Sequence, residues 1–303
     1  MSAKADSLKT VLYALGVNFA IFVGKLAAAV LTGSGAMLAE AIHSLADCGN
    51  QGLLLVGMKQ AKRPASPDYP LGYGKAIYFW SFLVALMLLT VGGLFSLYEG
   101  WHKFNHPEPL QWPWLAAGVL MFSLIAEGFS MRTCLIEVNK ARGDLSLYRW
   151  FRESRQAEMV VIFGEDLAAL LGLGFALVAV MSTIITGNPM FDAIGTLGIG
   201  VLLIIIAIFI AREVKAMLIG QSADPVTRDA IQAFIEGRPE IKRVFSLITL
   251  QLGNDIMVAV QAEMADASVS TAQTLLYINA IEADMRARFP DVRWSFFEPD
   301  DSE

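Results

Sequence analysis

Residues 37–58 read MLAEAIHSLADCGNQGLLLVGM and are the most informative part of the sequence. The stretch is long enough to cross a bilayer, since a membrane-spanning helix needs about 20 predominantly apolar residues. It nevertheless contains Glu40, His43, Asp47, Asn50 and Gln51. Ionisable side chains are costly in hydrocarbon, so such residues usually face the interior of a helix bundle and serve an ion pathway.

The spacing of these residues predicts a cation-binding face. At 3.6 residues per turn, His43 and Asp47 lie one turn apart on the same side of a helix. Glu40 lies a turn before His43, and Asn50 lies nearly a turn after Asp47.

The composition indicates a membrane protein. Of the 303 residues, 55% are hydrophobic and only 17% are charged, and the mean hydropathy is +0.52. An ordinary soluble globular protein is less apolar than this. Cys48 and Cys134 form no CxxC motif and lie in or beside apolar runs, so we expect packing residues and not a disulfide or a thiolate metal site.

The hydropathy pattern predicts six transmembrane helices in a domain of residues 1–219. Six apolar runs each approach the length of about 20 residues that a span requires: 11–31, 37–58, 77–98, 112–131, 159–185 and 191–211. Lys and Arg gather on one face, and the opposite loops contain essentially only Lys103. The positive-inside rule therefore places both termini in the cytoplasm, and we expect a bacterial inner or plasma membrane.

Residues 220–303 predict a small cytoplasmic α+β domain. Asp224 and Pro225 are typical of a helix N-cap and first helical position. The expected elements are a helix over 225–237, strands over 244–252 and 256–264, a helix over 270–288 and a strand over 293–298. This αββαβ order suits two helices on one face of a three-stranded sheet. The domain has 14 acidic and 7 basic residues, which argues against a nucleic-acid partner.

The link over residues 132–158 has two interpretations. It is partly amphipathic and is able to lie in the membrane interface, or it is a helical extension of the fourth span followed by a turn.

Other ionisable residues lie inside the predicted spans. Lys25 and Asp192 are near the outer ends of the first and sixth spans, where a structural ion pair between spans would satisfy both. Glu127, in the fourth span, shares a face with Ser123 and Ser130, and its role is open between structure and function.

Glu165 and Asp166 are adjacent in the fifth span and therefore point about 100° apart on a helix. We expect one of them to meet His43 and Asp47, while the other is a second-shell residue, a proton acceptor or a helix–helix hydrogen-bond partner. The alternative for the whole set is a buried polar network that only holds helices together.

One imidazole with two or three carboxylates suits Zn²⁺ in a tetrahedral site, and also Fe²⁺, Mn²⁺ or Co²⁺. Ligands must lose their protons to bind metal, so metal loading expels protons. This chemistry predicts antiport.

Several segments together resemble the cation diffusion facilitator family of divalent-metal/proton antiporters. They are GKLAAAVLTGSGAMLAEAIHSLAD from Gly24, YPLGYGKA from Tyr69, LYEGWHKFNHPEP from Leu97 and SADP from Ser222. The resemblance implies six spans, a cytoplasmic ferredoxin-like domain and a homodimer. It also implies an intramembrane site formed by the second and fifth spans, which maps onto His43, Asp47 and Asp166.

The sequence departs from the family pattern in an informative way. Common members supply a second HxxxD motif from the fifth span, but Ile162 stands four residues before Asp166 and Val161 four before Glu165. The segment SRQAEMVVIFGEDLAALLG resembles the divergent branch that includes animal mitochondrial zinc transporters, where an adjacent Glu-Asp also replaces the His. The usual GHGK of the cytoplasmic loop is here GYGK from Gly72, so we expect no metal site in that loop.

His102 and His106, spaced i, i+4 near Glu99 and Glu108, suggest either a weak metal port or a solvated loop. They are two of only three histidines in the chain, and the tail has none.

We therefore predict a homodimeric secondary transporter in the lipid bilayer, and not an enzyme, that exports a divalent cation, Zn²⁺ foremost, against protons without a permanently bound cofactor. The sequence contains no Walker motif, so we expect no direct coupling to ATP hydrolysis. The alternatives are a Fe²⁺, Mn²⁺ or Co²⁺ exporter and a non-transporting metal sensor or scaffold. The expected metal ligands are His43, Asp47, Asp166 and, as fourth ligand or proton carrier, Glu165; the expected second-shell or proton-path residues are Glu40, Asn50 and Glu127.

Overall fold

The computed structural model describes residues 2–266 and 268–301, with side chains described for residue 16 and from residue 18 onwards within those ranges. The chain forms two compact units. The first comprises Met1–Gly57, Trp80–Asp144 and Glu158–Val214, and the second comprises Met58–Phe79, Leu145–Ala157 and Lys215–Glu303.

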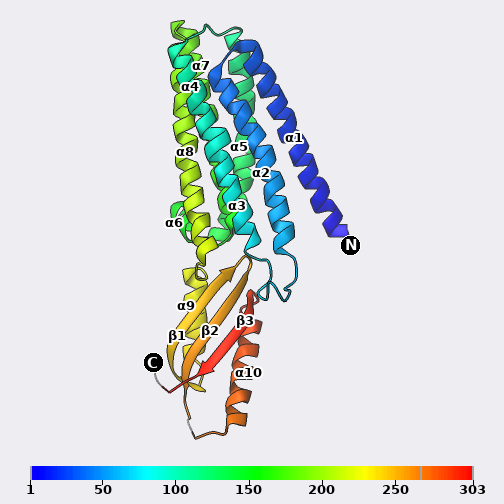
Figure 1. Cartoon of the computed structure of the whole chain (residues 1–303), viewed down its shortest axis with the longest axis vertical. Helices are drawn as coiled ribbons and strands as arrows, with labels where there is room; N and C mark the ends of the chain where they lie inside the picture. Colours follow the sequence, from blue (N-terminus) through cyan, green and yellow to red (C-terminus); the bar gives the residue numbers. More distant parts are fainter. Residues whose placement is uncertain (1, 267, 302–303) are drawn as a thin grey trace. The chain divides into compact units, whose positions relative to one another are not determined.

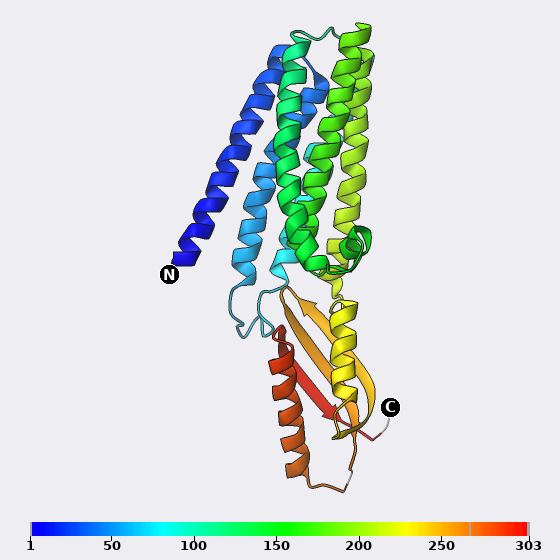
Figure 2. The same cartoon turned by 180° about the vertical axis from the view of Figure 1, so that it is seen from behind.

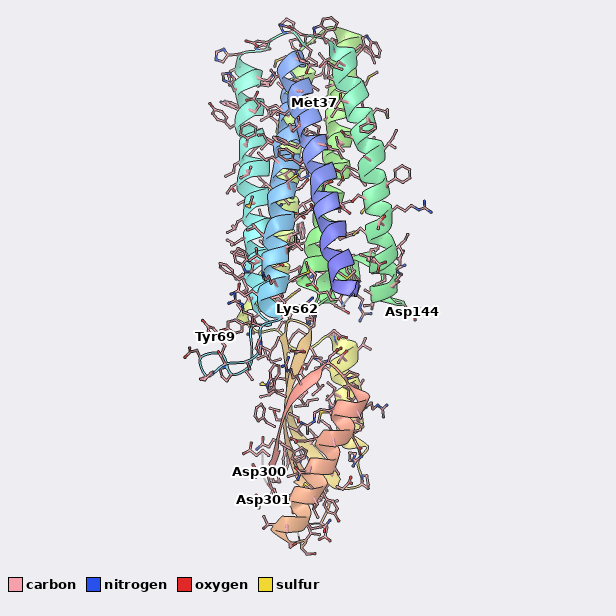
Figure 3. The ribbon with its side chains drawn as sticks, turned by 90° about the vertical axis from the view of Figure 1, so that its right-hand side faces the viewer. Met37, Lys62, Tyr69, Asp144, Asp300 and Asp301 are labelled. Atoms are coloured by element: carbon pink, nitrogen blue, oxygen red, sulfur yellow. The ribbon has the colours of Figure 1, made fainter. Side chains whose placement is uncertain are left out.

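The first unit is a bundle of long helices, which run side by side in both views of the ribbon (Figures 1 and 2). Met37 and Asp144 lie near opposite ends of this bundle (Figure 3). The helices are α1 (Ser2–Thr32), α2 (Gly35–Ala61), α3 (Ala76–Met87), the π-helix η1 (Leu88–Leu94), α4 (Phe95–Asn105), α5 (Pro113–Arg142), α7 (Ala157–Thr186) and α8 (Met190–Ile219).

These helices cover all six apolar runs of the sequence. Within the described residues, four helical stretches are long and apolar enough to cross a membrane: Ala76–Asn105, Pro113–Arg142, Ala157–Thr186 and Met190–Ile219. α1 adds a shorter apolar stretch, Asn18–Thr32. α2 is not among the four, because its polar residues lower its hydropathy. The chain is therefore a helical membrane protein.

Helix α8 packs against α4 and the end of η1 with almost no side chain between the backbones. A Cβ atom on Gly100 would lie 2.7 Å from the backbone nitrogen of Leu197, and one on Gly200 would lie 2.7 Å from that of Leu97. Lipid provides no hydrophobic drive for helix association, so close van der Waals contact through small residues takes its place. Gly100 and Gly200 therefore allow the close approach of the two helices.

The π-helix η1 interrupts the third apolar run, and the sequence pattern does not predict it. Hydroxyl groups satisfy carbonyls beside the interruption: Thr90 Oγ1 donates to the carbonyl of Leu86, and Ser96 Oγ donates to that of Gly92, both at 2.7 Å. Short π-helical segments inside α-helices are frequent at functional sites.

In the second unit, a three-stranded sheet carries two helices on one face (Figures 1 and 2). The order is α9 (Pro225–Glu236), β1 (Ile241–Leu252), β2 (Asp255–Met264), α10 (Thr271–Arg288) and β3 (Val292–Pro299), which confirms the predicted αββαβ order. The sheet order is β1-β2-β3, with β1 antiparallel and β3 parallel to β2. Residues such as Ile231, Ile281 and Met285 pack from the helices onto Val258 of the sheet.

Local signals at the helix ends are confirmed. The side chain of Asp224 accepts a hydrogen bond from the backbone N–H of Thr227 at 3.0 Å, and Pro225 occupies the first position of α9. Strand β1 begins three residues earlier than predicted and contains register shifts between Ile241 and Arg243 and between Val244 and Ser246.

In the link after α5, the structure agrees with the predicted helical extension of the fourth span. α5 continues as a helix to Arg142, and a separate short helix, α6 (Leu147–Glu153), follows. Ser146 caps α6 by accepting a hydrogen bond from the backbone N–H of Arg149 at 3.2 Å. The proline- and glycine-rich loop before α3 is irregular apart from one bridge between Ser66 and Tyr69.

Replacing Gly100 tests the contact between α4 and α8. We expect Gly100→Ala to lower the free energy of unfolding by about 1–3 kcal/mol, because overpacking forces the two helices apart. The measurement is the thermal unfolding midpoint in detergent. The matched control is Gly174→Ala, also within a helix, where an added Cβ would meet no atom within 4 Å. Equal midpoints for the two variants would contradict the close contact.

Candidate metal centre

The polar face of α2 is buried in the bundle. The side chains of Glu40, His43 and Asn50 are fully buried, and Asp47 is partly buried. His43 Nε2 lies 3.7 Å from Asp47 Oδ2, one helical turn away. The structure thus brings the two predicted ligands of α2 next to each other.

The adjacent acids of α7 face different neighbours, as their 100° separation requires. Glu165 is buried and accepts a hydrogen bond of 2.5 Å from Asn50 Nδ2 of α2. Asp166 instead faces α5, where Ser130 Oγ lies 3.4 Å from its Oδ1 atom and the Cys134 thiol donates it a hydrogen bond. Glu165 therefore meets α2, and Asp166 meets α5.

Four carboxylates form one electrostatic cluster. Asp47 interacts with the charges of Glu127, Glu165 and Asp166, and Asp166 also interacts with Glu127. The nearby positive charge that acts on Asp47 is that of Lys25. Carboxylates gathered in a medium of low dielectric constant repel one another strongly, so a cation or protons must compensate them.

Several buried polar atoms of α2 have no hydrogen-bond partner among the residues whose side chains are described. They are both imidazole nitrogens of His43, Oδ1 of Asp47, Oδ1 of Asn50 and Oε1 of Gln51. Buried polar groups in folded proteins are nearly always satisfied, and unsatisfied ones need an explanation. Imidazole nitrogens and carboxylate or amide oxygens are donors to divalent cations, so these atoms fit a site that receives such an ion.

The structure does not assemble the complete predicted ligand set. Within the described residues, no group of three or more His, Cys, Asp or Glu side chains is close enough together to hold a metal ion. His43 and Asp47 are neighbours, whereas Glu165 and Asp166 have the partners given above. The ligand set therefore remains a prediction.

The predicted ion pair between Lys25 and Asp192 is wrong. Lys25 is fully buried, with Nζ 3.3 Å from Glu40 Oε2 and donating to Ser44 Oγ at 2.8 Å. The ion-pair partner of Lys25 is therefore Glu40 of α2, and not Asp192 of α8.

Asp192 instead binds the start of α2. Its carboxylate accepts hydrogen bonds from the backbone N–H of Gly35 at 2.7 Å and from Ser34 Oγ at 2.6 Å. Lys103 Nζ lies 3.9 Å away. A carboxylate at a helix N-terminus is stabilised by the exposed N–H groups and the helix dipole, which accounts for this position.

Glu40, predicted as a second-shell or proton-path residue, has Lys25 as its ion-pair partner. Its second oxygen, Oε1, is buried and has no hydrogen-bond partner in the described part of the chain. A Cβ atom on Gly172 would lie 2.5 Å from this oxygen, so the glycine of α7 makes room for the carboxylate.

Two features beside the predicted ligands were missed. Cys134, interpreted as a packing residue, lies next to Asp166 in a hollow of about 390 Å³ that also includes Ser130. The signal was available, since Cys134 follows Ser130 by one helical turn. The other is η1, where a Cβ on Gly92 would lie 4.0 Å from His43 Nδ1, so the π-helix borders the candidate site.

The chain matches the model of the family described as "Cation efflux transmembrane domain" over residues 11–219. The chain belongs to this family. This confirms the resemblance to the cation diffusion facilitators.

Relatives of the family agree with this assignment. A Xenopus laevis protein named "proton-coupled zinc antiporter SLC30A9, mitochondrial" is 34% identical over 81% of this chain and 44% of its own length. The Arabidopsis thaliana protein "metal tolerance protein C4" is 29% identical over 76% of this chain and 50% of its own length. The Klebsiella pneumoniae "cation-efflux pump FieF" is 23% identical over 86% of this chain and 81% of its own length. The chain thus spans about half the length of the first two relatives.

Removing Lys25 tests the buried ion pair. We expect Lys25→Met to lower the free energy of unfolding by about 3–5 kcal/mol, because Glu40 then remains buried without a counter-charge. The double variant Lys25→Met/Glu40→Gln should recover much of this loss, since it leaves no charge unpaired. Thermal unfolding midpoints in detergent provide the comparison. A double variant no more stable than Lys25→Met would show that packing, and not charge, explains the effect.

Proposed function

We propose that this protein exports a divalent metal cation, Zn²⁺ foremost, across a membrane in exchange for protons. The observation that carries the proposal is the set of unsatisfied buried donor atoms around His43 and Asp47, beside a cluster of carboxylates. Membership of the cation efflux family and the printed names of the relatives support it.

In this proposal His43, Asp47 and Asp166 are metal ligands, and Glu165 is the fourth ligand or the proton carrier. The ion binds to deprotonated ligands and neutralises the carboxylates that otherwise repel one another. When the ion leaves, protons take its place on the same groups. Asn50 and Glu127 support the site from its edge, Asn50 through its hydrogen bond to Glu165.

For the complete site to form, α7 and α2 must approach each other around the ion. The hydrogen bond between Asn50 and Glu165 already links the two helices. The hydrogen bonds that Ser130 and Cys134 donate hold Asp166 towards α5. Breaking these weak contacts frees Asp166 to turn to the ion, so the site can exist in an assembled and an open form.

The imidazole of His43 and the printed name of the relatives support Zn²⁺ over Mn²⁺ and Fe²⁺. An exporter of Fe²⁺, Mn²⁺ or Co²⁺ remains the second candidate, because the set has only one imidazole and several carboxylates.

The proposal extends to the architecture. We propose six membrane spans in residues 1–219, both termini in the cytoplasm of a bacterial inner or plasma membrane, and a homodimer. Residues 220–303 are proposed to form the cytoplasmic ferredoxin-like domain, supported by the αββαβ order and the sheet order β1-β2-β3. No nucleic acid and no resident cofactor takes part.

Exchange in proteoliposomes tests the proposed function. We expect the parent protein to move Zn²⁺ inward, followed by an enclosed zinc dye, while protons leave, followed by an enclosed pH dye. Asp47→Asn and Asp166→Asn should each lower both rates about tenfold or more, because each removes a charged ligand. Asp144→Asn is the control, since Asp144 is exposed beyond α5.

The outcomes separate the candidates. Faster exchange of Mn²⁺, Fe²⁺ or Co²⁺ than of Zn²⁺ would assign another cation to the same site. No exchange of any of these ions by well-folded parent protein would favour a metal sensor or scaffold that retains the fold.

Glu165→Gln distinguishes the two roles proposed for Glu165. If Glu165 is a ligand, the variant should bind Zn²⁺ about tenfold more weakly or worse. If it carries a proton, zinc binding should persist while fewer protons are exchanged per ion. Equilibrium binding in detergent and the proton-to-zinc ratio in vesicles measure these quantities. A variant with unchanged binding and an unchanged ratio would exclude both roles.

A further inference from the structure

Two of the three histidines lie at the end of α4, far along the chain from the site on α2. His102 lies in the last turn of this helix and His106 is its C-cap residue. The backbone N–H of His106 donates to the carbonyl of His102 at 2.9 Å. Their spacing is therefore that of one helical turn, whereas the sequence alone left open a solvated loop.

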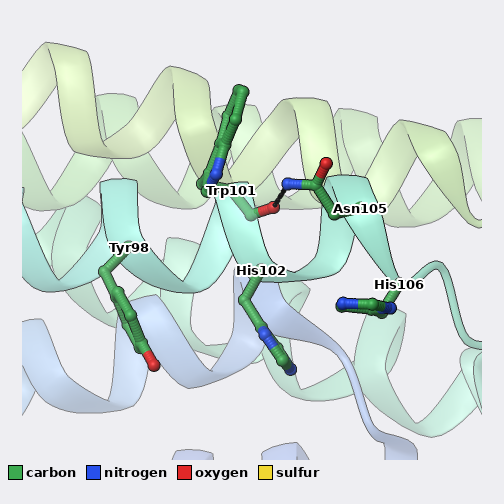
Figure 4. A pocket seen from close by; sticks show the side chains of 5 residues that line it. All are labelled: Tyr98, Trp101, His102, Asn105 and His106. Carbon is green, nitrogen blue, oxygen red and sulfur yellow. Dashed lines mark hydrogen bonds between the residues drawn. The ribbon is translucent and has the colours of Figure 1, made fainter.

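The spacing of the two rings fits a shared metal ion. Both side chains are exposed, and their ring centroids are 5.4 Å apart. For two imidazoles bound to one tetrahedral zinc with bonds of about 2.0–2.1 Å, the centroids are about 5 Å apart. Figure 4 shows both rings on the same side of α4, with Trp101 on the other side.

The end of α4 is held in place. Lys103 donates a hydrogen bond to the carbonyl of Gly33 in the turn between α1 and α2, and it also lies 3.9 Å from a carboxylate oxygen of Asp192 in α8. The aromatic ring of Tyr98 stacks over His102, with 6.5 Å between centroids and 13° between planes. Tyr98 and His102, together with Trp101, Asn105 and His106, line a hollow of about 550 Å³.

We propose that His102 and His106 chelate one divalent transition-metal ion, Zn²⁺ foremost, in this hollow. Two imidazoles i, i+4 on a helix are borderline donors that suit zinc, copper and nickel. Within the described residues, no cluster of three or more His, Cys, Asp or Glu side chains forms here, so water completes the coordination. Such a site is open and exchanges its ion readily.

The site lies at the end of the bundle where α8 begins, since Asp192 of α8 and Lys103 of α4 are neighbours there. The positive-inside rule places the loop that follows α4 on the side opposite the cytoplasm. If the proposed export holds, the histidine pair lies on the face where the ion leaves. This assignment of a side rests on the proposed function, whereas the metal binding does not.

Zinc stoichiometry tests the binding. The full chain without an affinity tag, in detergent and with Asp47→Asn present to weaken the intramembrane site, is dialysed to equilibrium against radioactive Zn²⁺. We expect His102→Ala, His106→Ala and the double variant each to lose the same one equivalent, because neither imidazole holds the ion alone. Glu108→Gln is the control and should retain that equivalent. Unchanged stoichiometry in the double variant, or a loss in only one single variant, would overturn the proposal.

The spectrum of bound Cu²⁺ distinguishes metal binding by the two histidines from a purely structural role of these residues. Cu²⁺ binds nitrogen sites more tightly than Zn²⁺, and its electron paramagnetic resonance spectrum shows how many nitrogens coordinate it. We expect two nitrogens in the Asp47→Asn protein and no such species after either histidine is replaced. A two-nitrogen signal that survives His102→Ala would contradict the chelate. Binding here without exchange in vesicles would reject the proposed export and leave this site standing.

Discussion

A charge buried among apolar helices needs a partner, because hydrocarbon solvates neither sign of charge. Most of the buried charges in this bundle meet that condition. Lys25 is paired with Glu40, the carboxylate of Asp192 accepts the N–H groups at the start of α2, and Glu165 accepts the amide of Asn50. These contacts fix how α1, α2, α7 and α8 are rotated and how deep each lies.

Against this background, the unsatisfied part of α2 is distinctive. Among the described residues, His43 has two buried ring nitrogens without hydrogen-bond partners and Asp47 has one such oxygen. Glu40, Asn50 and Gln51 of the same helix each add one more unsatisfied atom. Buried charges close to these two residues do have partners: Lys25 pairs with Glu40, which lies about one turn before His43 and two turns before Asp47. A site left open in this way is explained by a visiting ion better than by imperfect packing.

The sequence was sufficient for one-dimensional features and insufficient for pairings. Helical periodicity placed His43 beside Asp47 and separated Glu165 from Asp166, because those relations depend only on the turn of a helix. The partner of Lys25 depends on the tilt and rotation of neighbouring helices, which no local pattern encodes, and the prediction of Asp192 failed there. Asn50 and Glu165 were both singled out, but their mutual hydrogen bond needed the structure.

In α7, Ile162 stands where common family members have a histidine, and the structure shows what surrounds it. Ile162, at the position where common family members have His, is 42% exposed and lines the hollow beside Asp166. The polar groups that Asp166 meets come instead from α5, as Ser130 and Cys134. The surroundings of this acid are thus shared between two helices, where the usual motif would draw them from one.

The π-helix has a consequence for the geometry of the whole rod from Ala76 to Asn105. A π-helical turn holds an extra residue, so everything beyond it is rotated by about 100° relative to an uninterrupted α-helix. The stripe that faces the bundle before Leu88 is therefore out of phase with the stripe that follows Leu94. The π-helix therefore changes which side of the rod faces the bundle. Gly92 lies beside His43 in the middle of the rod, whereas the ring of His102 is exposed at its end.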